Sequence, residues 1–228
     1  MSDEKVQALV AEVAKLDDAE FTAYSGGWKG NIGTALVDAV FSIRARYQAE
    51  DPAKGVIGRL RAFNEKHPEA MNDLSALASL GEQELIDIMG RGVTGKQTKA
   101  ACVVEAAEAL RALEPAIVTA ADLLAADPYA VKKAYTGVDG LGWVTCEYFQ
   151  MLLGKPGVKA DRMIVRFVNA ALARAGFDEV GPSEAHGLVA QAFEINDRGA
   201  ASLTHYEHAI WRAKGELAVE DDEPDPDA

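Results

Sequence analysis

Apolar residues recur along most of the chain at the three- and four-residue spacing of an α-helix. No segment shows the alternation of apolar and polar side chains that is typical of a half-buried strand. We therefore predict an all-α fold. The expected helices cover residues 5–16, 32–47, 51–63, 74–80, 82–89, 96–113, 119–126, 127–135, 143–153, 160–175, 183–196 and 202–213.

Short helices joined by small loops predict a compact bundle of about ten helices, and the lack of a fixed internal period argues against a solenoid. We expect two helical lobes. One lobe comprises residues 32–155, and the other combines residues 1–31 with residues 156–215. From residue 216 onward the sequence is acidic and contains proline, which predicts a disordered tail over 216–228.

The net charge of −13 is unfavourable for a protein that binds nucleic acid, but the charge is distributed unevenly. The last thirteen residues carry seven acids and no base, and the first twenty carry six acids and two bases. The chain ends therefore account for −11 of the total. Residues 29–61 hold six bases against three acids, and residues 127–166 hold six against four. The interior is thus compatible with a local basic face.

Other features exclude several classes of protein. No apolar run approaches the roughly 18 residues of a membrane span, and the acidic, amphipathic N-terminal pattern is not that of a signal peptide. The two cysteines, Cys102 and Cys146, form neither a disulfide framework nor a metal cluster, so we expect a cytoplasmic protein. His205 and His208 lie three residues apart, but packing is the favoured interpretation over a metal site. We expect no metal and no cofactor.

A glycine-containing hairpin provides the most specific signal. Gly140, Leu141 and Gly142 lie between two helical patterns, and Thr145 and Asp161 follow. Such a turn can direct backbone N–H groups at the start of a helix toward a phosphate. A plain helix–helix turn would also use glycine. Likewise, Thr145 could bind phosphate or cap the helix, and Asp161 could be an N-cap for the next helix.

The stretch 138–145, followed by Asp161, resembles the helix-hairpin-helix DNA glycosylases, a superfamily that includes endonuclease III and the alkyladenine and oxoguanine glycosylases. The family pattern is a hairpin of the type Leu-Pro-Gly-Val-Gly, then Thr, a helix, a short loop and a catalytic Asp before a further helix. The resemblance covers about residues 32–175. It implies that Asp161 stabilises positive charge on the sugar as the N-glycosidic bond breaks. The hairpin residues that it implies to contact double-stranded DNA are Gly140, Leu141, Gly142 and Thr145.

The resemblance also suggests roles for side chains outside the hairpin. Arg44, expected at the end of the 32–47 helix, corresponds to the side chain that fills the gap left by a flipped base; the alternative is a solvated Arg at a helix C-terminus. Trp143 and Tyr148 are candidates for a base pocket, although such aromatics are more often core. Lys96, and less specifically Lys99, are candidates for phosphate contacts or are simply solvated.

Departures from the family pattern narrow the expected activity. Val144 occupies the position of the lysine that forms a Schiff base with the sugar in bifunctional members, so no lyase activity is expected. No cysteine follows Cys146, so the iron–sulfur loop is absent. Asp139 replaces the hairpin proline and brings a negative charge near the expected phosphate. We predict a monofunctional DNA glycosylase, and the alternative is a non-catalytic DNA- or protein-binding module.

Overall fold

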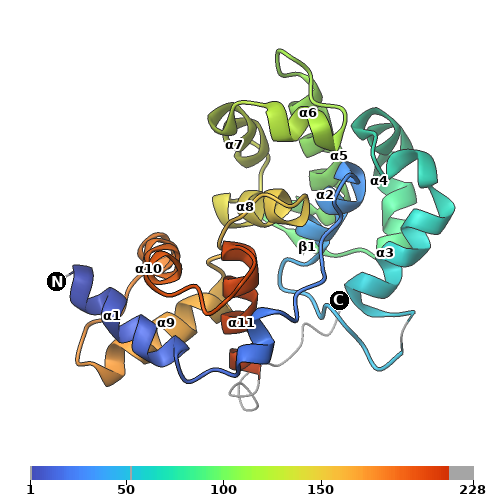
Figure 1. Ribbon diagram of the computed structural model, residues 1–228. Coiled ribbons are helices and arrows are strands. Elements are labelled where there is room, and N and C mark those ends of the chain that lie inside the picture. Colours follow the sequence, from blue (N-terminus) through green and yellow to red (C-terminus); the bar gives the residue numbers. More distant parts are fainter. Residues whose placement is uncertain (1, 52, 216–228) are drawn as a thin grey trace. The chain divides into compact units, whose positions relative to one another are not determined.

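The computed structural model describes residues 2–51 and 53–215 (Figure 1). The described residues are mostly helical, which confirms the all-α prediction. They form two compact units. We call residues 27–155 the central unit and residues 2–26 with 156–215 the terminal unit; the predicted lobes had their first boundary at residue 31. The predicted acidic tail, 216–228, lies outside the described residues.

The central unit contains seven α-helices, a short 3-10 helix and one small antiparallel sheet within its described residues. The sheet pairs Val93 with Thr98 and Thr94 with Gln97. In chain order the elements are α2 (Ile32–Phe41), α3 (Gly55–Lys66), η2 (Pro68–Ala70), α4 (Leu74–Met89), β1 (Val93–Thr94), β2 (Gln97–Thr98), α5 (Lys99–Arg111), α6 (Ala120–Ala125), α7 (Pro128–Thr136) and α8 (Trp143–Leu152).

Helix α2 is the core of the central unit. All ten of its residues are buried, as expected for a helix that is apolar on almost every side. It packs against α3, α5 and α8, which surround it in Figure 1. Gly33 is required where α2 passes the backbone of η2, because a Cβ on it would lie 2.0 Å from the carbonyl oxygen of Ala70.

Two helix boundaries differ from the sequence prediction in informative ways. Helix α2 ends at Phe41 and not at residue 47, because Ser42 to Ala45 turn away from the helix. Helix α3 begins at Gly55 and not at Asp51. The predicted break at Gly81 is confirmed: α4 is interrupted there by a non-helical backbone with φ of 75°.

The terminal unit joins the two ends of the described chain. It contains α1 (Ser2–Val13), η1 (Asp18–Phe21), α9 (Arg162–Arg174), α10 (Pro182–Ile195) and α11 (Leu203–Gly215). Helix α1 packs against α9 and α10, and α11 packs against η1 and α9. The rings of Phe21 and Phe193 both contact Tyr206, whose side chain is fully buried.

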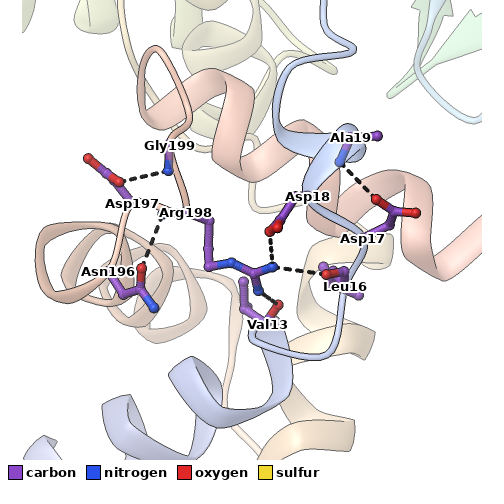
Figure 2. Close-up of polar contacts among 9 residues, drawn as sticks. All are labelled: Val13, Leu16, Asp17, Asp18, Ala19, Asn196, Asp197, Arg198 and Gly199. Carbon is purple, nitrogen blue, oxygen red and sulfur yellow. Dashed lines mark hydrogen bonds and ion pairs between the residues drawn. The ribbon is translucent and has the colours of Figure 1, made fainter.

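Arg198 ties the N-terminal segment to the loop between α10 and α11 (Figure 2). Its guanidinium donates to the carbonyl oxygens of Val13 at 2.8 Å and Leu16 at 3.0 Å, and it pairs with Asp18. It also lies 5.0 Å from the centre of the Phe21 ring. A cation on the last carbonyls of α1 complements the negative end of the helix dipole. Arg198 therefore caps α1 from a segment that is distant in sequence.

Within the described ranges, no helix combines the length and the apolar character required to cross a membrane.

Candidate nucleic-acid interface

The turn between α7 and α8, residues 137–142, is built by a close approach of two backbones. Gly140 has φ of +83°, a conformation that side-chain-bearing residues rarely adopt. A Cβ on Gly140 would lie 2.6 Å from the carbonyl oxygen of Thr94, and one on Gly95 would lie 2.7 Å from the Cα of Gly140. The turn and the β1–β2 hairpin therefore fit together only because both positions lack a side chain.

Hydrogen bonds join the same two segments. The Thr94 hydroxyl donates to the carbonyl oxygen of Gly140 at 3.0 Å. The backbone N–H of Lys96 donates to Oδ2 of Asp139, also at 3.0 Å. Asp139 thus uses its carboxylate to anchor the β1–β2 hairpin. From the sequence, Asp139 was expected only to place a charge near the phosphate, and this structural role was not predicted.

Gly142 differs from Gly140, although the sequence analysis gave them the same role. Its φ is −111°, and a Cβ added to it would meet no atom within 4 Å. Its N–H donates to Oγ1 of Thr145 at 3.2 Å, and the Thr145 hydroxyl lies 2.8 Å from the Gly142 carbonyl oxygen. Thr145 therefore caps α8, one of the two roles that its sequence position allowed. The first backbone N–H groups of any α-helix have no partner within the helix itself.

Arg44 lies in the turn that follows α2, and its backbone is in the left-handed region with φ of +50°. Such a conformation is uncommon for a residue other than glycine and often marks a functional position. The side chain is exposed. The sequence analysis placed Arg44 in a helix, whereas the structure presents it on a turn.

A buried lysine holds this turn. Lys99, the first residue of α5, is 5% exposed, and its ammonium donates to the carbonyl oxygens of Ile43 at 2.7 Å and Phe41 at 3.3 Å. The suggestion that Lys99 contacts phosphate is therefore wrong, because its charge is occupied at the end of α2. Lys96, by contrast, is exposed beside the 137–142 turn.

A buried carboxylate that the sequence analysis missed supports the same region. Asp38 is fully buried in α2 and accepts hydrogen bonds from Nε1 of Trp28 at 2.6 Å, Oγ of Ser42 at 2.7 Å and the hydroxyl of Tyr47 at 2.9 Å. Ser42 and Tyr47 flank Arg44 in sequence. The sequence did offer a signal for Asp38, because it is a single acid inside a strongly apolar helix. A carboxylate that is buried in this way must accept hydrogen bonds from nearby donors.

The two cysteines are buried. Burial raises the pKa of the Cys102 thiol, and burial raises that of Cys146 to about 11. The Cys102 thiol donates to the carbonyl oxygen of Asp139 at 3.4 Å. Through Cys102 and Lys99, α5 therefore contacts both the 137–142 turn and the Arg44 turn.

The two aromatic residues predicted to form a base pocket do not share a face of α8. They are five residues apart, which corresponds to a rotation of about 140° around an α-helix. Trp143 has the ammonium of Lys132, from α7, 5.9 Å from its ring centre. Tyr148 packs against the core of the central unit. A sandwich of one base between these two rings has no support from this arrangement.

Asp161 lies in the terminal unit and is the N-cap of α9. Its Oδ1 accepts from the backbone N–H groups of Met163 at 2.8 Å and Ile164 at 3.3 Å. Its Oδ2 lies 3.8 Å from the ammonium of Lys159, and a quarter of its side chain is exposed. The capping role is therefore real; it uses Oδ1, while Oδ2 faces Lys159 and part of the Asp161 side chain stays exposed. The catalytic role stays a prediction.

His205 and His208 take part in aromatic packing. The Tyr24 ring centre lies 5.3 Å from that of His205 and 4.8 Å from that of His208, and Trp211 stacks on His208. Burial, and then the charges of Arg212 and His205, lower the pKa of His208 to about 4. Within the described part of the chain, no group of three or more His, Cys, Asp or Glu side chains is arranged to bind a metal ion.

Comparisons with known proteins support the fold and place the chain in a family. A solved structure of the Schizosaccharomyces pombe 3-methyladenine DNA glycosylase Mag1 in complex with abasic DNA is similar with a TM-score of 0.53. The identity is 14%, and the match covers 94% of this chain and 99% of that one. No curated protein sequence matches the chain. A family model matches residues 4–215, and the chain therefore belongs to the family described as "Domain of unknown function (DUF8548)".

Proposed function

We propose that this protein binds double-stranded DNA in base-excision repair and is a monofunctional DNA glycosylase that releases a modified base. The observation that carries the proposal is the similarity in fold, over nearly the whole of both chains, to a DNA glycosylase solved with abasic DNA. The α7–turn–α8 segment and the Asp161 cap of α9 support it, because they combine a phosphate-binding geometry with a carboxylate in one chain.

The central unit supplies the proposed DNA contacts. The 137–142 turn and the first turn of α8 present backbone N–H groups at a positive helix end, which suits a phosphate. We assign α7, this turn and α8 as a helix-hairpin-helix motif. Lys96 lies beside the turn, and Arg44 extends from its own turn as the side chain that would replace an extruded base. The carboxylate of Asp139 accepts from Lys96 N–H, so part of its charge is already compensated near the phosphate.

The proposed chemistry is hydrolysis of the N-glycosidic bond. The bond between C1′ and the base nitrogen breaks, and its electron pair leaves with the base. A water oxygen then bonds to C1′, and the proton that this water loses goes to the departing base or to solvent. The products are the free base and an abasic site. The Asp161 carboxylate stabilises the positive charge on the sugar in the transition state. Val144 provides no amine, so the strand is not cut through a Schiff base.

The test is release of free base from duplex DNA. Methylated DNA is the first substrate, since the similar structure is that of a 3-methyladenine DNA glycosylase, followed by DNA that carries uracil or oxidised purines. Removing the Asp161 charge by Asp161→Asn should lower base release about 10²- to 10³-fold, the usual effect of losing one group that stabilises transition-state charge.

The chain offers a matched control for this substitution. Asp73 caps α4 with bonds to the N–H groups of Ser75 at 2.6 Å and Ala76 at 3.0 Å, so Asp73→Asn makes the same chemical change at a cap outside the proposed site. It should leave base release unchanged. If no substrate in the panel gives base release that depends on Asp161, the glycosylase proposal is wrong, and retained affinity for abasic DNA would then indicate the non-catalytic binding module.

A further inference from the structure

One face of α11 holds the segment that leads to Asp161. The backbone N–H of Gly157 donates to Oγ1 of Thr204 at 3.2 Å. The backbone N–H of Lys159 donates to the carboxyl group of Glu207. Thr204 and Glu207 are three residues apart and so lie on the same side of the helix. Both are buried, with exposures of 6% and 5%.

The residues of the held segment, 157–161, alternate in their contacts. The side chains of Val158 and Ala160 are buried, at 0% and 1% exposure. The N–H groups of Gly157 and Lys159 bond to α11, as described above. Asp161 is the last residue of this segment and the N-cap of α9. The position of its carboxylate therefore depends on α11 as well as on α9.

We propose that Glu207 is a positioning residue for Asp161: from its buried place on α11 it accepts the Lys159 N–H and fixes the segment that leads to the Asp161 carboxylate. This inference rests on the proposed function and deepens it. Two neighbouring carboxyl groups do not ionise independently, and the more buried one keeps the proton. A neutral Glu207 adds no second negative charge beside the Asp161 carboxylate.

The surroundings of Glu207 favour its neutral form. Burial, and then the negative charge of Asp161, raise the pKa of Glu207 to about 8, while Lys159 and the Lys159 N–H oppose the shift. Three acidic groups on other elements that pack against α11 have partners of their own. On η1, Glu20 pairs with Arg212 and Asp18 pairs with Arg198, and on α10, Glu184 pairs with Lys5.

The first test does not require enzymatic activity. In the full-length protein with ¹³C-labelled carboxyl groups, the Glu207 signal, identified by its loss in Glu207→Gln, should titrate near pH 8. In Asp161→Asn its midpoint should fall by at least about half a pH unit, because the like charge is gone. A midpoint near the ordinary value for Glu, or one that Asp161→Asn does not change, would overturn the inference.

The second test separates positioning from folding. Glu207→Gln keeps an oxygen acceptor for the Lys159 N–H and should retain base release near pH 7, while losing the inflection near pH 8 that Glu207 causes in the wild type. Glu207→Ala removes the acceptor and should lower base release at least about tenfold, since small displacements of catalytic groups have large effects on rate. Affinity for abasic DNA, assigned to the central unit, should change less than about threefold in both variants.

The outcomes distinguish this inference from the proposed function. Base release that survives in Asp161→Asn would contradict the proposed function itself. Base release that depends on Asp161, with Glu207→Ala equal to the wild type in rate and pH profile, would contradict only the role of Glu207.

Discussion

The 137–142 turn and the 157–161 segment both place groups for the proposed reaction, but different contacts hold them. Backbone packs on backbone at the turn, where Gly95 and Gly140 approach so closely that neither tolerates a Cβ. At the segment, buried side chains of α11 accept the backbone N–H groups. The turn should therefore respond mainly to changes in volume and little to pH. The segment should tolerate conservative changes and respond to the protonation of Glu207.

The largest effect is expected at the turn. Gly140→Ala combines a Cβ contact of 2.6 Å with a positive φ, and we expect it to lower the free energy of unfolding by about 2–4 kcal/mol. Gly142→Ala is the control within the same turn, because its added Cβ meets nothing within 4 Å. Urea denaturation measures both. Equal losses in the two variants would show that close packing does not shape the turn.

A smaller loss is expected at the Arg44 turn. Lys99→Met keeps most of the side-chain volume but leaves the carbonyl oxygens of Phe41 and Ile43 without this donor, which should cost about 1–3 kcal/mol of unfolding free energy. Lys96→Met changes an exposed lysine nearby and should lie within about 0.5 kcal/mol of the wild type. Urea denaturation again gives the comparison. If Lys99→Met were as stable as Lys96→Met, this result would contradict the role of Lys99 in holding the turn that carries Arg44.

The contact between Glu207 and the 157–161 segment should make the free energy of unfolding depend on pH. Glu207 has a raised pKa of about 8 in the folded protein, so the folded state holds a proton that the unfolded state has already released. Wild-type stability should therefore fall as pH rises from about 4.5 to 8, by at most about 1.4 kcal/mol for each pH unit. Glu207→Gln cannot ionise, so its stability relative to the wild type should increase over that window. Parallel curves of unfolding free energy against pH would contradict this.

The smallest effect concerns the surface of the proposed DNA contact. Lys96→Met should weaken binding to a duplex with an abasic analogue only a few-fold, and should reduce the slope of log affinity against log salt concentration by about 1 if one phosphate contact is lost. Glu108→Gln on α5 changes an exposed charge away from the turn and serves as the control. If Lys96→Met left the slope of log affinity against log salt concentration unchanged, this result would contradict a phosphate contact by Lys96.

Local patterns predicted the helices well, because apolar spacing along a helix is a property of the nearby sequence. The interruption at Gly81 and the cap at Asp161 were likewise readable from residue type. The end of α2 could not be predicted in this way, because Lys99, which is distant in sequence, stabilises the turn that follows the helix.

Differences between similar residues depended on contacts between distant segments. Gly140 and Gly142 look alike in the sequence, and only the approach of β1–β2 distinguishes them. Glu207 looks like an ordinary helix-surface acid, and its burial depends on residues 157–161. Asp38 carried a readable signal, an acid within an apolar helix, but its three donors come from turns whose paths the sequence does not specify.

The most direct test of the whole account is release of free base from methylated duplex DNA by the wild type, Asp161→Asn and Asp73→Asn, measured alongside affinity for abasic DNA. The account predicts base release by the wild type and Asp73→Asn, a loss of about 10²- to 10³-fold in Asp161→Asn, and similar DNA affinity in all three. Base release by Asp161→Asn at the wild-type rate would contradict it.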